Sequence, residues 1–190
     1  MKIGVKKWAL MGLLSMCIGF GYAQTPQHGD VANKGDWYLN VGVGIPYLTF
    51  MGNTPQTFSF PYSLGVELGI TPWLGLGPQV GFVNFPASGA QYWELRMRGA
   101  VRIGVLLDEQ LDLGFSKAGV DVYLAINPGV RLEYANVVNG VNAVRVSTGV
   151  QLGCRYHLTE TFGVFAEGGV GFQNFGRAGL SVRLVEGKAN

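Results

Sequence analysis

The sequence predicts an all-β fold, an eight-stranded antiparallel up-and-down transmembrane β-barrel that follows an export signal. Three observations predict this fold. Only 14% of the 190 residues are charged, glycine is the commonest residue type with 30 copies, and apolar and polar residues alternate through most of the chain after Gly35. No run of about 18 apolar residues occurs after the N-terminal segment, so helical membrane spans are not expected there.

Residues 1–23 have the features of a secretory signal peptide. Three lysines lie within residues 2–7, an apolar stretch covers Trp8 to Phe20, and Gly21-Tyr22-Ala23 offers small residues to a signal peptidase. Cleavage before Gln24 is expected, and lipoprotein processing at Cys17 is the alternative. Residues 24–34 would then form a flexible mature N-terminus, and residues 35–184 the barrel. Without the three lysines, 11 basic residues remain against 12 acidic ones, so no basic patch predicts nucleic-acid binding.

Alternation with a period of two predicts the strands. Between Asp121 and Glu133 the even positions are apolar, and the odd positions are polar or small. The length of this pattern favours membrane strands of about 9–11 residues over soluble strands of about 5–6 residues. The eight predicted strands are approximately Asp36–Ile45, Tyr62–Ile70, Leu74–Phe85, Tyr92–Leu107, Val120–Tyr134, Ala143–His157, Phe162–Phe172 and Gly179–Leu184.

The connections between these segments differ in length. Ile70–Trp73 and Leu158–Thr161 are tight turns, as is typical of the periplasmic side of such barrels. Leu107–Gly119 is too long for a tight turn, and a short helix is the one interpretation offered for it. The longer, polar or Gly-rich loops are Pro46–Phe60, Asn84–Gln91 and Ala135–Asn142, the last with the hairpin pair Asn139-Gly140.

Charged side chains share one parity within the predicted strands, and this parity should face the lumen. An arginine facing lipid near the bilayer midplane would cost about 2–4 kcal/mol. We expect a charge network in which Arg96, Arg98 and Arg102 form a basic wall, with Asp121, Glu133 and Glu94 as their main partners. Arg177 is placed in the last loop, outside the strands. The predicted network comprises Glu67, Glu94, Arg96, Arg98, Arg102, Asp121, Arg131, Glu133, Arg145, Arg155, Glu167 and Arg183.

This network has two interpretations. An eight-stranded barrel is just wide enough for side chains to fill, so a salt-bridged plug is favoured over a narrow polar conduit or a site for an anionic solute. Pro78 and Pro128 fall in mid-strand on the lipid-facing parity, and each removes a donor from the ladder. They predict either local bulges or a lateral gate for a lipid or an apolar solute.

Two segments carry a resemblance to a known family. The turn Thr71-Pro72-Trp73-Leu74-Gly75-Leu76 and the strand from Phe162 to Gly171 resemble those of small bacterial outer-membrane β-barrels of the OmpA/OmpX type, a family common in Bacteroidetes in its broad form. The resemblance implies a monomer in a Gram-negative outer membrane, with lipid and the barrel-assembly machinery as partners. The chain departs from that pattern at residues 185–190, which follow the last strand without a terminal aromatic residue.

Catalytic and metal-binding chemistry have weak support in the sequence. The only histidines are His28, in the expected flexible segment, and His157, which lacks the spacing of outer-membrane lipid hydrolases. Cys154 has a lipid-facing parity and indicates an apolar filler. No cofactor or metal is expected. The predicted function is a non-enzymatic outer-membrane barrel in envelope structure or surface interaction. The alternative is a narrow channel or lateral-gate transporter for small or apolar solutes, and a lipid-modifying enzyme comes third.

Overall fold

A computed structural model describes residues 34–45, 47–51, 54–85, 89–111, 113–115, 117–134, 143–171 and 176–185. The predicted signal peptide, Cys17, His28, the Asn139-Gly140 pair and residues 186–190 lie outside the described residues. The predictions made for them therefore stay predictions.

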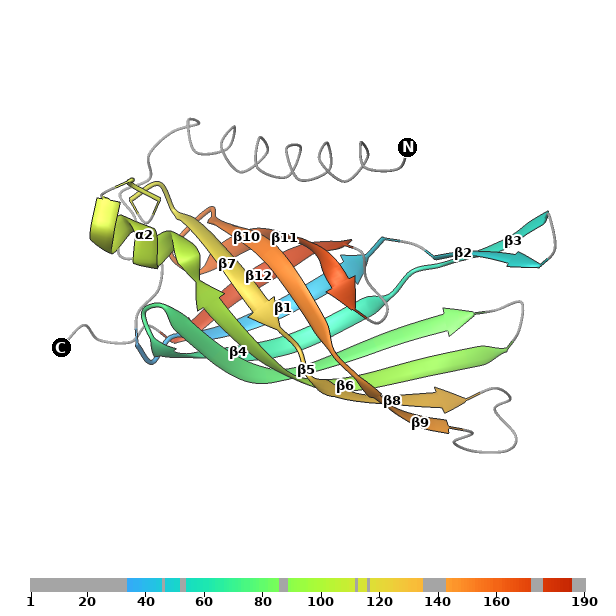
Figure 1. Cartoon of the computed structure of the whole chain (residues 1–190). Helices are drawn as coiled ribbons and strands as arrows, with labels where there is room; N and C mark the ends of the chain where they lie inside the picture. Colours follow the sequence, from blue (N-terminus) through green and yellow to red (C-terminus); the bar gives the residue numbers. More distant parts are fainter. Residues whose placement is uncertain are drawn as a thin grey trace, which may run out of the picture.

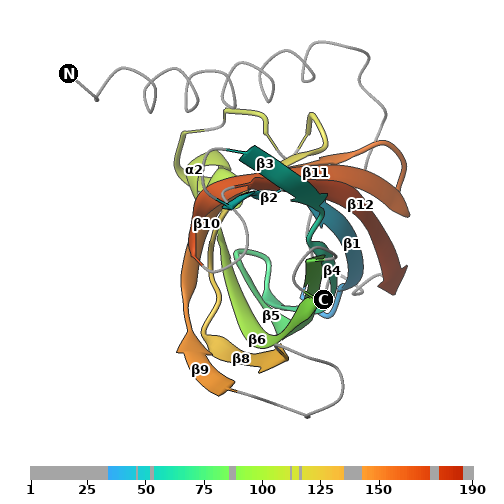
Figure 2. The ribbon, with the colours of Figure 1, turned by 90° about the vertical axis from the view of Figure 1, so that its right-hand side faces the viewer.

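The described strands form a closed antiparallel barrel (Figures 1 and 2). The wall runs in the order β5-β4-β1-β12-β11-β10-β7-β6, and the pairing of β5 with β6 closes it. Eight strand paths result, because β8 and β9 continue β7 and β10 at the far end of the wall. This confirms the predicted fold class. The strands are β1 (Trp37–Gly44), β4 (Tyr62–Thr71), β5 (Leu74–Phe85), β6 (Ala90–Arg102), β7 (Val120–Ile126), β8 (Gly129–Tyr134), β9 (Ala143–Ser147), β10 (Gly149–His157), β11 (Phe162–Gly171) and β12 (Gly176–Val185).

The two ends of the barrel differ in the connections between their strands. One end carries the tight turns after β4 and β10 and the helix α2 (Ile103–Leu111), and it is called the α2 end. The opposite end is called the hairpin end. There β2 (Tyr47–Met51) and β3 (Thr54–Ser59) form a two-stranded sheet within the predicted loop 46–60, and Figure 1 shows this hairpin projecting beyond the wall.

Two predicted boundaries were wrong. The fourth strand was extended to Leu107, but β6 ends at Arg102 and α2 begins at Ile103. The residues of Ile103–Leu107 are all apolar, so the alternation that marks a half-buried strand is lost there. The last strand begins at Gly176, three residues earlier than predicted, which places Arg177 in β12.

The barrel has an apolar outside and a polar inside. Large apolar side chains point outward, including Leu64, Leu95 and Leu180, which are 51%, 55% and 59% exposed. Among the described residues the buried ones are mainly polar or charged, and Ala100, Tyr123 and Ala125 form a small cluster of buried hydrophobic residues. This inversion of a soluble fold is the arrangement expected of a barrel surrounded by lipid. Among the described helices, none has the length and apolarity needed for a membrane span.

Candidate functional site

A buried carboxylate, Glu67, lies at the centre of the lumen. It projects inward from β4 and receives arginines from β6 and β10. Its Oε1 lies 2.8 Å from Nη2 of Arg102, and its Oε2 lies 3.2 Å from Nη2 of Arg155 and 3.5 Å from Nε of Arg98. All four side chains are at most 4% exposed. Glu67 therefore joins three arginines from two other strands, of which β10 lies across the barrel from β4.

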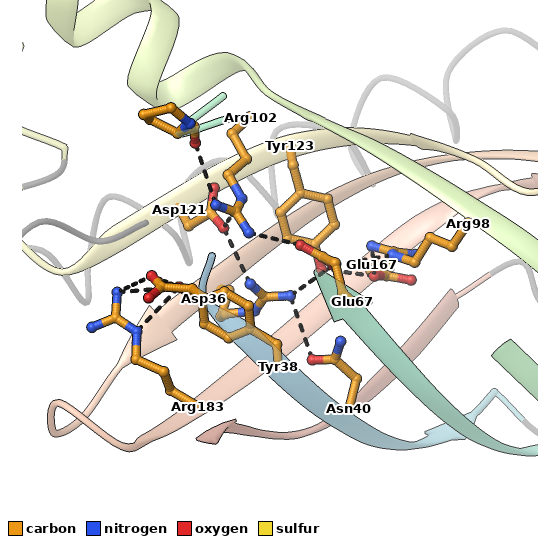
Figure 3. Close-up of polar contacts among 12 residues, drawn as sticks. Asp36, Tyr38, Asn40, Glu67, Arg98, Arg102, Asp121, Tyr123, Glu167 and Arg183 are labelled. Carbon is orange, nitrogen blue, oxygen red and sulfur yellow. Dashed lines mark hydrogen bonds and ion pairs between the residues drawn. The ribbon is translucent and has the colours of Figure 1, made fainter. Parts of the chain in front are cut away.

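Asp121 of β7 forms a second junction between the same arginines. Its Oδ2 lies 3.5 Å from Nε of Arg102 and 3.4 Å from Nη1 of Arg155. Arg155 also donates through Nη2 to Oδ1 of Asn40, at 3.4 Å. Because Arg102 and Arg155 each contact both carboxylates, Glu67 and Asp121 belong to one compact cluster, which Figure 3 shows.

Glu167 of β11 extends the cluster toward the hairpin end. Its Oε1 lies 2.6 Å from Nη2 of Arg98 and accepts a hydrogen bond of 2.7 Å from the Tyr123 hydroxyl. Its Oε2 lies 2.5 Å from Nε of Arg177, which also donates through Nη1 to Oγ of Ser63 at 3.0 Å. The prediction that Arg177 lies in a loop was wrong. Arg177 has the same parity as Arg183, so a predicted strand that began at Gly176 would have placed the Arg177 side chain in the lumen.

Tyr38 of β1 fills the α2 end of the lumen and is surrounded by guanidinium groups. Its ring centroid lies 4.5 Å from Cζ of Arg155, 5.2 Å from that of Arg102 and 5.7 Å from that of Arg183. Such contacts stabilise a cation against the face of an aromatic ring. Asp36 binds Arg183 at 2.8 Å and accepts a hydrogen bond from the Tyr38 hydroxyl (Figure 3). The sequence prediction omitted Asp36 and Tyr38 from the network.

The remaining predicted residues lie toward the hairpin end. Oε1 of Glu133 lies 2.5 Å from Nη2 of Arg131 and 3.1 Å from Nε of Arg145, whose side chain is 63% exposed. Glu94 pairs with Arg96, two residues along the same strand. Glu133 was predicted to pair with the basic wall of β6. In the structure its pairing partner on β6 is Tyr92, and its ion pairs are with Arg131 and Arg145.

Two inward glycines make room for the central side chains. A Cβ atom at Gly153 would lie 2.3 Å from Cε2 of Tyr123, and one at Gly75 would lie 2.5 Å from Oε1 of Glu67. These distances are far shorter than an ordinary van der Waals contact. The glycine content of the strands thus allows large polar side chains to fill a narrow lumen.

Pro78 and Pro128 lie on the two sides of β6, opposite the same residue. Pro78 is the register partner of Met97, and the Pro128 carbonyl accepts a hydrogen bond of 2.9 Å from the Met97 amide. The β5–β6 ladder runs through Pro78 without a register shift. The β6–β7 pairs before Pro128 and the β6–β8 pairs after it also have the same register. The predicted bulges are therefore wrong, and the prolines interrupt the ladder without inserting a residue.

The residues considered for catalysis are placed as follows. His157 is buried and packs edge-on against Tyr38, with 6.0 Å between ring centroids. Thr159 accepts hydrogen bonds through Oγ1 from the amides of Thr161 and Phe162, which forms the exposed turn after β10. Cys154 is half-buried in β10. Within the described ranges, no group of three potential metal ligands occurs.

Comparisons with known proteins agree with the fold. No protein-family model and no curated protein sequence matches the chain. The N-terminal β-barrel domain of Pseudomonas aeruginosa OprF is similar over 80% of this chain and 97% of that one, with a TM-score of 0.52 and 12% identity. The comparison supports the barrel fold. P. aeruginosa OprG is similar over 81% of this chain and 92% of that one, with 8% identity and a TM-score of 0.44. A de novo designed transmembrane β-barrel is similar over 80% of this chain and 98% of that one, with 12% identity and a TM-score of 0.48.

Proposed function

We propose that this chain is a non-enzymatic protein of a Gram-negative outer membrane, exported by a cleaved signal peptide and inserted as a monomer by the barrel-assembly machinery. In this proposal its lumen is plugged, and it serves in envelope structure or surface interaction. The tight turns and both barrel termini would face the periplasm, and the β2–β3 hairpin would face the cell exterior.

The membrane placement is supported by the outward face of the wall. Leu124, Val150 and Val164 point away from the lumen and are 36%, 41% and 37% exposed, while the inward neighbours Tyr123 and Gln151 are buried. Exposing such an apolar surface to water around the whole barrel would be unfavourable, whereas lipid acyl chains would cover it. Exposed Trp37, Trp73 and Phe162 at the α2 end fit an interfacial aromatic girdle.

The plug is supported by the cluster around Glu67, and this observation carries the functional proposal. The carboxylates Glu67, Asp121 and Glu167 of β4, β7 and β11 contact Arg98 and Arg102 of β6 and Arg155 of β10, and all six side chains are at most 4% exposed. Charges at this depth are tolerated only when they are paired and hydrogen-bonded. A solute or hydrated ion crossing the lumen would have to separate these pairs.

Conductance tests the proposal. The purified protein, reconstituted in planar phospholipid bilayers, should give no steady single-channel current, because the ion pairs close the lumen. Insertion is verified beforehand by protease protection in vesicles of the same lipid. A steady current through the unmutated protein would defeat the plug and support the narrow-channel alternative.

The lateral-gate alternative has one observation of its own, the alignment of Pro78 and Pro128 on both sides of Met97. Replacing both prolines by valine would restore two ladder donors, that of residue 128 toward β6 and that of residue 78 toward β4. If the wall opens there, uptake of an apolar dye into proteoliposomes should fall in the double variant. The plug proposal predicts equal dye uptake by the wild type and the double variant.

A lipid-modifying activity is tested separately, by mass spectrometry of lipid A from cells with and without the gene. We expect identical spectra.

A further inference from the structure

The helix α2 lies outside the barrel wall, in the long connection between β6 and β7. Its Gly104 is buried, and a Cβ atom at that position would lie 3.2 Å from the amide nitrogen and 3.6 Å from Cβ of Val122. Asp121 and Tyr123 point into the lumen, so Val122 points outward. Figure 2 shows α2 at the perimeter of the ring instead of across its opening.

The first part of α2 is apolar in every direction. Ile103 to Leu107 contains no polar residue, and successive residues of a helix are separated by about 100°, so these side chains surround the helix axis. Within this run Gly104 is buried, and Ile103, Val105, Leu106 and Leu107 are half-buried. Leu111 and Leu113, which follow, are 62% and 52% exposed. An apolar surface of this kind marks a contact with another apolar phase.

The position of α2 connects this surface to the outward face of the wall. The helix starts directly after Arg102, whose amide donates to the carbonyl of Trp73 at 2.8 Å. Trp73 is 39% exposed and lies at the end of the barrel where aromatic residues mark the membrane interface. Further along, Glu109 and Gln110 are exposed, which provides the polar side of an interfacial segment.

We propose that α2 and Leu113 form a lipid-binding foot that lies in the periplasmic leaflet of the membrane, with phospholipid acyl chains as its partner. This inference rests on the proposed membrane placement of the barrel. Interfacial helices bind lipid through buried apolar area while polar residues stay at the headgroups. The foot explains why the connection is longer than a tight turn and why Leu111 and Leu113 are exposed.

Depth-dependent quenching tests the foot. In a Cys17→Ser/Cys154→Ser background, single cysteines replace Leu106, which lies about 200° around the helix from Gly104, Leu124 on the outward wall, or Glu160 in the exposed turn after β10. Each variant is folded into dioleoylphosphatidylcholine vesicles, checked for the folded gel mobility and labelled with one fluorophore. Quenching is then measured with nitroxide-labelled acyl chains and with aqueous iodide.

The expected result is that the probe at position 106 behaves like the probe at 124, with several-fold stronger quenching by the acyl-chain nitroxide than at position 160. Iodide should quench position 160 preferentially. If position 106 behaves like position 160, or is shielded from both quenchers, the foot is wrong while the barrel placement stands. If position 124 itself behaves like position 160, the membrane placement of the barrel fails instead.

Discussion

The two halves of the lumen use the same residue types in different ways. Toward the α2 end, Glu67, Arg102 and Arg155 are at most 1% exposed, and Glu67 and Asp121 each meet two or more arginines from other strands. Toward the hairpin end, Glu133 pairs with Arg145, whose side chain is 63% exposed. The comparison teaches that inward parity alone does not make a plug. The charges must also be enclosed by wall on all sides, which holds around Glu67 and for the Glu94–Arg96 pair but not for Glu133 and Arg145.

The largest expected effect follows from removing the central carboxylate. Glu67→Ala leaves three arginines around an empty position, and an uncompensated buried charge costs about 3–5 kcal/mol. We expect a loss of that order in the free energy of unfolding, measured by urea titration in lipid vesicles with tryptophan fluorescence. The matched variant Glu133→Ala should cost clearly less, because solvent reaches Arg145, one of its two partners, and part of Glu133 itself. Equal losses would remove the distinction between the halves.

An intermediate effect is expected from filling the space beside Tyr123. Gly153→Ala places a methyl group where only 2.3 Å separates the ideal Cβ position from the ring. Overpacking of this kind costs about 1–3 kcal/mol. At the outward Gly99 the nearest atom, Cδ2 of Leu76, is 3.4 Å away, so Gly99→Ala should be close to neutral. The same urea titration compares the two variants, and a greater loss from Gly99→Ala would contradict the tight packing inferred for the lumen.

The smallest effect is expected at the exposed arginine. Arg145→Ala should lower the free energy of unfolding by less than about 1 kcal/mol, and this difference should shrink further in high salt, since exposed pairs are screened. Arg155→Ala serves as the buried counterpart, and its much larger loss should persist as salt rises. A salt-insensitive, large loss at Arg145 would show that the hairpin half is as enclosed as the α2 half.

The sequence was sufficient for the strands and for the direction of most charged side chains, because a period of two is a local property. It was not sufficient for the pairing of those charges. Which arginine meets Glu67 depends on the register of several strands, and nothing in the sequence near Glu67 specifies Arg155. Residues at strand ends were also missed. Arg177 was assigned to a loop, and the apolar run Ile103–Leu107 was read as strand although it forms the start of α2.

The claim that the α2 half is the seal can be tested by removing one ion pair from each half. Glu67→Ala/Arg155→Ala and Glu133→Ala/Arg145→Ala each delete one negative and one positive charge, so the net charge of the lumen is unchanged. In planar bilayers we expect steady single-channel currents from the first variant, and none from the second variant or the wild type. Currents from the second variant with none from the first would contradict the claim that the cluster around Glu67 closes the barrel.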